Sequence, residues 1–293
     1  MRLLMRICLV FMGISGVLYS QNDAVTYKYL GKVKPRYARD IQSSNWSVGA
    51  ETMDRDYTIY NNWKEYLGPL GIKKARLQAG WAKTEKQPGV YNWVWLDDIV
   101  FDMAEQGVEP WMCLSFWNPV YASYQSKSVV PTDEKTLKEW DQWVRLIVVR
   151  YKHIIDEWEV WNEPNNRYNT PEAYCHLLIR TAEIVRSIQP HARILAMSLA
   201  GVGTEGVEKA LHIVAEAGKL HLIDEITYHP YSKNPDESYA AVARLRELIA
   251  QYSDHIIIRQ GENGAPSAYR EFKALRNYPW TELSQSKWAL RRM

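Results

Sequence analysis

The stretch that decides the fold is Trp158-Glu159-Val160-Trp161-Asn162-Glu163-Pro164-Asn165. Its first half has the apolar pattern of a buried strand, and Pro164 ends that strand because proline cannot donate a hydrogen bond to a strand ladder. Glu163 is therefore predicted to lie at the carboxyl-terminal tip of a strand, with the neutral amide of Asn162 beside it. In proteins built from parallel strands and helices, catalytic groups lie at this end.

A second stretch has the same form: Arg259-Gln260-Gly261-Glu262-Asn263-Gly264, directly after Ile256-Ile257-Ile258. Glu262 is thus predicted at another strand tip, and the glycines on either side let the backbone approach a ligand closely. The two glutamates are 262 − 163 = 99 residues apart. At roughly 35 residues per strand–helix unit, this separation is about three units and predicts strands four and seven, which face each other across a barrel.

The chain around these two stretches alternates short apolar strands with helical patterns, which is typical of a parallel sheet with helical crossovers. We expect strands at residues 46–50, 75–79, 109–116, 157–161, 194–199, 225–228 and 256–260. We expect helices at residues 95–106, 134–151, 171–188, 207–217, 236–252 and 284–292, and a helix-like stretch at 60–67. The predicted fold is α/β, a TIM (β/α)8 barrel, in one domain over residues 45–293.

This predicted barrel is one strand short. A closed TIM barrel has eight strand–helix units, and the pattern gives seven. Without an eighth strand, strands one and seven have unpaired edges, which are costly and prone to aggregation. We therefore expect either that the domain at 45–293 is truncated at its carboxyl terminus or that something else closes the barrel.

The amino terminus has the pattern of a secretory signal. Arg2 and Arg6 precede an apolar run over residues 7–18, and the small residue Ser20 follows it. The run is too short for a comfortable membrane span. We predict a signal peptide at 1–20, an extension at 21–44, and a mature protein that is secreted or periplasmic and has no membrane span. An uncleaved amino-terminal anchor is the alternative.

The charge balance argues against nucleic acid as a partner. The chain has 36 basic and 34 acidic residues, and residues 1–20 hold two arginines and no acid, so the mature chain has 34 of each. Phosphate binding needs a basic surface, whereas a neutral balance suits a neutral substrate such as a sugar. The 13 Trp and 19 Tyr against only 4 Phe raise the expectation of carbohydrate binding slightly, because rings with a polar edge stack on sugars and tolerate water.

The three cysteines give no disulfide framework. Cys8 lies in the predicted signal peptide, and a bond between Cys113 and Cys175 is conceivable in an oxidising compartment, but two buried free thiols are the favoured interpretation. The cysteines and histidines lack the spacing of a zinc site, and we predict no metal and no cofactor. The sequence gives no indication of oligomeric state.

Glu163 and Glu262 together fit the chemistry of a glycosidic bond. Its cleavage needs one carboxyl group that protonates the leaving oxygen and a second that attacks carbon or activates water. Either glutamate alone would be interpreted as an ordinary surface residue. Two of them at the tips of opposed strands predict a glycoside hydrolase.

These motifs resemble clan A of the glycoside hydrolases, the barrel superfamily with its acid/base on strand four and its nucleophile on strand seven. Within the clan, the chain most resembles the families of β-xylosidases and α-L-iduronidases, over residues 45–265. The residues that carry the resemblance are Asn162-Glu163-Pro164, Glu262, Arg76 near the end of strand two, and His229-Pro230-Tyr231 after strand six.

The resemblance implies a retaining, double-displacement mechanism. Glu262 would attack the anomeric carbon, and Glu163 would act first as acid and then as base. Arg76 and Tyr231 would favour the charged form of Glu262. Asn162 would bond the sugar 2-hydroxyl. His229 would orient a substrate hydroxyl, or would be a structural histidine.

Weaker candidates for substrate contacts come from the other strand ends. Trp81, Trp117 and Asn118 follow strands two and three and are candidates for a sugar-binding platform, although core packing is an equally good interpretation of each tryptophan. Glu51 follows strand one and is a candidate for binding a sugar hydroxyl. The stretch at residues 80–93 resembles the loop after strand two in this clan, with structural roles for Glu85, Gly89, Tyr91 and Trp93.

The sequence therefore predicts a secreted retaining glycoside hydrolase that cleaves a poly- or oligosaccharide. The alternative from another class is a catalytically inactive carbohydrate-binding barrel protein, which the missing strand favours and the intact motifs oppose. A barrel enzyme with phosphate or metal chemistry has no support, because the sequence has no phosphate-binding glycine loop and no ligand cluster.

Overall fold

The computed structural model describes residues 31–32, 34–121, 123, 128–271 and 273–292. The predicted signal peptide at 1–20 lies outside these residues, as do residues 21–30 and 33 of the predicted extension. The chain divides into two units, Met1–Lys34 and Pro35–Met293, and the second unit holds all the elements below. In the described part of the chain, no helix has the length and apolar character to cross a membrane.

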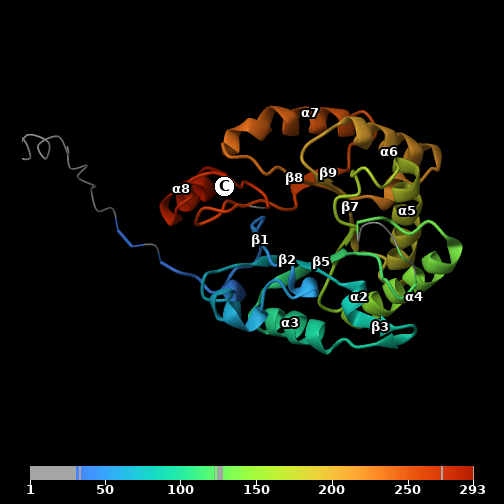
Figure 1. Ribbon diagram of the computed structural model, residues 1–293, viewed down its shortest axis with the longest axis horizontal. Helices are drawn as coiled ribbons and strands as arrows, with labels where there is room; N and C mark the ends of the chain where they lie inside the picture. Colours follow the sequence, from blue (N-terminus) through green and yellow to red (C-terminus); the bar gives the residue numbers. More distant parts are fainter. Residues whose placement is uncertain (1–30, 33, 122, 124–127, 272, 293) are drawn as a thin grey trace, which may run out of the picture. The chain divides into compact units, whose positions relative to one another are not determined.

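A single parallel sheet forms the centre of the second unit. Its strands are β1 (Ser47–Gly49), β2 (Lys74–Gln78), β5 (Glu109–Leu114), β6 (Glu157–Val160), β7 (Arg193–Ala200), β8 (Glu225–His229) and β9 (Ile257–Gln260). They pair in chain order, and every pair is parallel. The sheet curls with the helices on its outside (Figure 1). This arrangement confirms the prediction of a TIM-type barrel with seven strands, and among the described residues β1 and β9 are the two edges of the sheet.

The outer helices follow the strands as predicted. They are α3 (Val94–Glu105), α4 (Glu134–Tyr151), α5 (Pro171–Ile188), α6 (Glu205–Glu216), α7 (Tyr239–Ala250) and α8 (Glu282–Arg292). Side-chain caps explain where two of these helices begin. The Asp133 side chain accepts a hydrogen bond from the backbone of Thr136 at the start of α4, and Thr170 caps α5 just before Pro171.

Two segments differ from the prediction. The helix-like stretch at 60–67 forms two short 3-10 turns, Tyr60–Asn62 and Lys64–Tyr66. The loop at 80–93 contains a four-residue helix, α2 (Trp81–Thr84), and an antiparallel pair, β3 (Glu85–Gln87) and β4 (Val90–Tyr91). Cys113 and Cys175 are both free and buried, which confirms the favoured interpretation of the cysteines.

An aromatic cluster packs beneath the end of β6. The ring centroid of Trp140 lies 5.0 Å from that of Trp143, and 5.5 Å from those of both Trp81 and Trp161. All four indoles are fully buried. Large apolar rings with this much contact dominate the energetics of a core. The cluster therefore anchors the segment that leads from Trp161 to Glu163.

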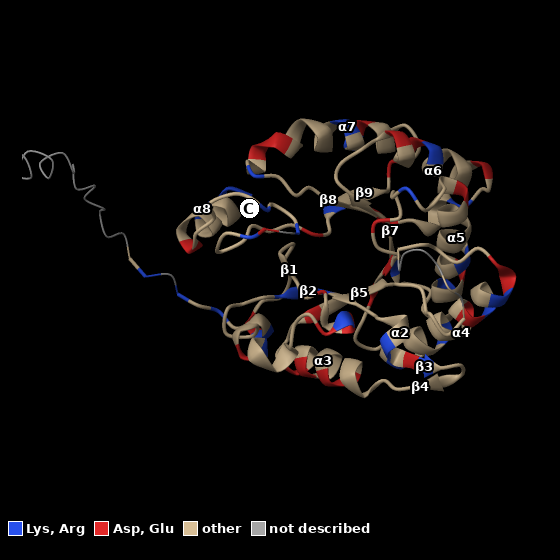
Figure 2. Ribbon diagram, viewed as in Figure 1, with Lys and Arg blue, Asp and Glu red and all other residues tan. Residues whose placement is uncertain are grey.

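A layer of charged side chains crosses the interior of the curl, formed by the first residues of β2, β6, β7 and β8 and by Arg259 of β9. Arg259 Nη1 lies 2.7 Å from Glu157 Oε2, and Arg259 Nη2 lies 2.7 Å from Glu225 Oε1. Lys74 Nζ lies 2.7 Å from Glu157 Oε1, and Arg193 Nη2 lies 2.6 Å from Glu225 Oε1. On the outer helices, by contrast, acidic and basic residues are interspersed (Figure 2).

Glu157 makes the stability of this layer depend on pH. Burial alone would raise the pKa of Glu157, but hydrogen bonds and charge from Arg259 and Lys74 outweigh it and lower the pKa from 4.5 to about 2. A lowered pKa contributes stability that is present above the unfolded-state value and is lost as the pH falls through the folded-state value. We therefore expect the free energy of unfolding to fall between about pH 4.5 and about pH 2.

Urea denaturation at several pH values tests this prediction. Glu157→Gln should be less stable than the wild type at pH 7 and should lose less further stability in acid. Glu208→Gln, on the exposed face of α6, is the matched control and should follow the wild type. Equal acid sensitivity of the Glu157→Gln variant and the wild type would contradict the assignment.

Candidate active site

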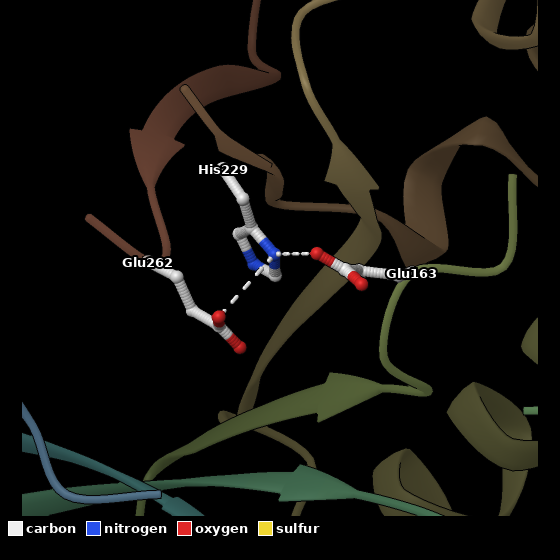
Figure 3. A group of neighbouring side chains, drawn as sticks. All are labelled: Glu163, His229 and Glu262. Carbon is white, nitrogen blue, oxygen red and sulfur yellow. Dashed lines mark hydrogen bonds and ion pairs between the residues drawn. The ribbon is translucent and has the colours of Figure 1, made fainter. Parts of the chain in front are cut away.

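Three side chains from different strand ends converge at the carboxyl-terminal side of the sheet (Figure 3). His229 ends β8, while Glu163 and Glu262 follow β6 and β9. Nδ1 of His229 lies 3.0 Å from Oε1 of Glu163 and 3.8 Å from Oε2 of Glu262. One oxygen of each carboxylate and one ring nitrogen all lie within 4.8 Å of one another. The structure thus brings together the two glutamates that were predicted to face one bond.

A tight backbone turn presents Glu163. Trp161 has a φ of 67° and Glu163 a φ of 51°, both in the left-handed region that costs free energy for residues other than glycine. The Glu163 backbone N–H donates to the carbonyl of Ser198 at 2.9 Å, and the Asn166 amide donates to the Glu163 carbonyl at 2.8 Å. These contacts on both sides hold the turn. The Glu163 side chain is 37% exposed, so solvent reaches it.

Glu262 is held more tightly and is only 17% exposed. Arg76 Nη1 donates to its Oε1 at 2.6 Å, and the Tyr231 hydroxyl donates to its Oε2 at 3.1 Å. Burial would raise the pKa of Glu262, but the charge of Arg76 and the hydrogen bonds from Tyr231 and Arg76 lower it below the usual 4.5. Glu262 is therefore ionised at neutral pH.

Arg76 is fully buried and serves several further partners. Its Nε donates to Glu159 Oε2 at 2.9 Å, its Nη1 to Glu51 Oε1 at 3.2 Å, and its Nη2 to Asn162 Oδ1 at 3.0 Å. One guanidinium thus faces three carboxyl groups, counting Glu262. Burial raises the pKa of Glu51, and the negative Glu262 adds to the increase against the opposing charge of Arg76. Glu51 therefore takes up a proton more readily than Glu262.

Glu159 and Ser198 belong to this network, and the sequence did not single them out. Glu159 is fully buried on β6 and also accepts a hydrogen bond from the Thr227 hydroxyl. The sequence feature that could have identified Glu159 is the position of a charged residue between the buried residues Trp158 and Val160. Ser198 is fully buried and contacts both Arg76 and His229, and the strand pattern held no comparable signal for it.

Two of the predicted platform residues are not presented to the site. Trp81 is fully buried between the rings of Tyr121 and Trp143, and its indole N–H donates to Glu85 Oε2 at 2.6 Å. Asn118 is 1% exposed, and its amide donates to the Glu85 carbonyl at 2.7 Å. Both faces of the Trp81 ring are thus covered by protein, which corresponds to the core-packing interpretation.

Trp117 is half-buried and packs against the hydrophobic core. It lies outside the lining of a cavity of about 730 Å³ beside the active site. Glu51, Tyr231 and Glu262 line one part of this cavity. The cavity also reaches residues of β1 and β9 and the charged layer at the other end of the strands.

Glu163, His229 and Glu262 also have the donor atoms for a metal ion. The guanidinium of Arg76, at 2.6 Å from Glu262, already neutralises that carboxylate and would repel a cation. Each of the three side chains already has a protein partner at hydrogen-bond distance. The arrangement is therefore better suited to moving protons and forming a covalent bond than to holding a metal.

Comparisons with known proteins agree with this geometry. The family model for glycosyl hydrolases family 39 matches residues 70–263. A β-xylosidase of Geobacillus stearothermophilus is 28% identical over 166 residues, which are 50% of this chain and 32% of that protein.

Solved structures give the same result for the fold. A family 39 β-xylosidase from Caulobacter crescentus superposes with a TM-score of 0.62 at 21% identity, covering 78% of this chain and 55% of that one. A family 39 glycoside hydrolase from the gut symbiont Bacteroides cellulosilyticus WH2 has a TM-score of 0.65 at 20% identity, covering 84% and 52%. This chain therefore spans about a third of the curated relative and about half of each solved one.

The match to the family model assigns this chain to a family. It extends over most of the chain and includes both strand tips that carry Glu163 and Glu262. It also confirms the resemblance to clan A and its β-xylosidases that the strand-tip motifs indicated. The chain belongs to glycosyl hydrolases family 39.

Proposed function

We propose that this chain carries the active centre of a retaining glycoside hydrolase that cleaves xylosides in a poly- or oligosaccharide. One observation carries the proposal: Glu262, held ionised by Arg76, lies with an oxygen within 4.8 Å of an oxygen of the half-exposed Glu163. Carboxyl groups about 5–5.5 Å apart are typical of retaining enzymes, whereas inverting enzymes need about 6.5–9.5 Å to admit a water. The choice of xylose as the sugar rests on the β-xylosidases that are similar to this chain.

In the first step, a Glu262 oxygen attacks the anomeric carbon while the bond from that carbon to the leaving oxygen breaks. Glu163 gives its proton to the leaving oxygen, which departs as an alcohol. The product is a glycosyl ester on Glu262. Arg76 and Tyr231 hold the attacking carboxylate in place and keep it charged until the bond forms.

In the second step, Glu163 is a carboxylate and takes a proton from water, whose oxygen attacks the anomeric carbon and releases Glu262. Nδ1 of the His229 imidazole faces both carboxyl groups, at 3.0 Å from Glu163 Oε1 and 3.8 Å from Glu262 Oε2. In this proposal Asn162, whose Oδ1 accepts a hydrogen bond from Arg76, bonds the sugar 2-hydroxyl. We further propose that the enzyme acts outside the cytoplasm, which rests on the signal-like pattern at residues 1–20.

Trapping of the glycosyl-enzyme tests the proposal. The protein is incubated with a panel of 2-deoxy-2-fluoro glycosides that carry a dinitrophenyl leaving group, starting with the xyloside. The fluorine slows both steps, while the good leaving group restores the first, so the ester accumulates. We expect peptide mass spectrometry to find one sugar adduct on Glu262 and none in Glu262→Gln.

Glu208→Gln, the exposed control on α6, should label like the wild type. An adduct on Glu163 would reverse the two roles. Absence of any adduct across the panel, in protein shown to be folded by circular dichroism, would favour the alternative of a catalytically inactive carbohydrate-binding barrel.

A further inference from the structure

β7 contains a bulge just before its end. Its register against β8 shifts between Ala196 and Leu199, and the two residues between them, Met197 and Ser198, have φ values of 72° and 38°. Left-handed backbone at two adjacent non-glycine residues is costly and persists only where the surroundings enforce it. Here the hydroxyl of Tyr174, on α5, accepts from the Met197 N–H at 2.6 Å and donates to the Val160 carbonyl at 3.2 Å.

The bulge turns the backbone carbonyl and the side-chain hydroxyl of Ser198 toward the site. The Ser198 carbonyl accepts from the backbone N–H of Glu163 at 2.9 Å. The Ser198 hydroxyl oxygen lies 3.2 Å from Arg76 Nη2 and 3.2 Å from His229 Nε2. The side chains of Ser198, Arg76 and His229 are all buried, so these contacts exclude water.

In the series of contacts from Arg76 through Ser198 to His229, the donor at the Arg76 end is known. A guanidinium can only donate, so the Ser198 oxygen must accept from Arg76. The hydroxyl hydrogen of Ser198 is then available to His229 Nε2, which accepts it only if that nitrogen carries no proton. In a neutral imidazole the proton is then on Nδ1, the nitrogen that lies 3.0 Å from Glu163 Oε1.

We propose that Ser198 is a positioning residue that fixes His229 as the Nδ1–H tautomer, so that His229 donates to Oε1 of Glu163 and leaves the acid proton on Oε2. The catalytic consequence rests on the proposed function, whereas the tautomer itself does not. With the opposite tautomer, a bare Nδ1 would accept a hydrogen bond from protonated Glu163, and the acid proton would point away from the leaving oxygen.

The position of the ring supports this assignment. A side chain at Gly261 would place its Cβ 3.0 Å from His229 Nε2, so the glycine leaves room for the ring at this spot. Glu163 and Glu262 face the imidazole on the Nδ1 side, whereas the guanidinium of Arg76 lies beyond the Ser198 hydroxyl on the Nε2 side. Two carboxylates on that side favour a proton on Nδ1, and the hydroxyl of Ser198 on the other side favours a bare Nε2.

The tautomer can be measured directly. In the full chain labelled with ¹⁵N-histidine, two-bond ¹H–¹⁵N correlation spectra at neutral pH distinguish the two tautomers, and His229→Asn identifies the His229 signals among the seven histidines. We expect a protonated Nδ1 and a bare Nε2 in the wild type, and a shift toward Nε2–H in Ser198→Ala. A protonated Nε2 in the wild type, whether the ring is neutral or charged, would overturn the proposal.

Kinetics test the consequence for the acid. On a xyloside with an alkyl leaving group, Ser198→Ala should lower kcat/KM on the order of 10- to 100-fold, because departure then needs the acid proton. On the dinitrophenyl xyloside, which needs little acid assistance, the change should stay within about twofold. Equal losses on both substrates, or no loss on either, would contradict the positioning role.

Ser187→Ala, which removes a hydroxyl that donates to the Ile184 carbonyl at 2.7 Å near the end of α5, is the matched control and should leave the ratio of the two substrates unchanged. Thermal unfolding checks that both variants fold. If the wild type cleaves no glycoside, the proposed function fails, and the spectra of the wild type still decide the tautomer.

Discussion

Replacement of Glu163 by glutamine is expected to lower kcat/KM on an alkyl xyloside by about 10²- to 10⁴-fold, the usual contribution of general acid catalysis. Glutamine keeps the shape of the side chain and an oxygen that can accept from His229 Nδ1, at the position that lies 3.0 Å away in the wild type. It has no proton to give to the leaving oxygen. The loss should therefore be much smaller on the dinitrophenyl xyloside, whose leaving group departs as a stable anion.

The second step separates this prediction from simple damage to the site. Without the Glu163 carboxylate, water attacks the glycosyl ester slowly, so Glu163→Gln should release dinitrophenolate in a rapid burst followed by a slow steady rate. Stopped-flow absorbance measures both phases, and Glu208→Gln should behave like the wild type. A uniform loss on both substrates without a burst would show that Glu163 is not the acid/base.

Arg76→Met is expected to destabilise the fold by about 3–5 kcal/mol at neutral pH, the cost of leaving a buried charge without its partner. Arg76 is fully buried and bonds Glu51, Glu159 and Glu262. Methionine has a comparable apolar stem and fills much of the same space. The three carboxyl groups would then face one another with no guanidinium between them.

The destabilisation should shrink in acid. Arg76 supplies the main charge that opposes burial, so without it the pKa values of Glu51 and Glu262 rise in the folded state. A raised pKa contributes stability that is present below the unfolded-state value and is lost as the pH rises through the folded-state value. The variant should therefore lie closer to the wild type near pH 4.5, the ordinary glutamate value, than at pH 7.

Chemical denaturation at the two pH values measures the difference, with Arg145→Met on the exposed side of α4 as the control. The free energy of unfolding of that control should be close to that of the wild type at both pH values, because surface substitutions usually change stability by less than about 0.5 kcal/mol. A difference between Arg76→Met and the wild type that stays constant or grows in acid would mean that the three carboxyl groups do not depend on Arg76.

The strands and most helices could be predicted because their apolar runs are unambiguous. The pair β3 and β4 could not, because Glu85-Lys86-Gln87 has no apolar alternation. A buried carboxylate organises that hairpin instead: Glu85 accepts from Trp81, from the Tyr121 hydroxyl and from the backbone of Gly89. Trp81 and Gly89 lie four residues before and after Glu85, and Tyr121 lies 36 residues away, so the hairpin depends on hydrogen bonds to one buried side chain and not on an apolar pattern.

The principal site residues could be predicted because a parallel sheet places strand ends together. Glu163, Glu262, Arg76 and His229 all follow from that rule and from the resemblance. Ser198 does not follow from it. Counting alternate residues from Arg193, whose side chain faces the interior, puts Ser198 on the helix side, and only the bulge reverses its direction.

The aromatic cluster beneath β6 gives the protein a built-in optical probe. Indole rings whose centroids lie 5.0–5.8 Å apart couple their electronic transitions, so Trp81, Trp140, Trp143 and Trp161 should give an intense near-ultraviolet circular dichroism band. Trp161 is two residues from Glu163 along the chain. A ligand that adjusts the turn at Glu163 tilts one of the coupled transition dipoles, and occupancy of the site can then be followed by spectroscopy without any label.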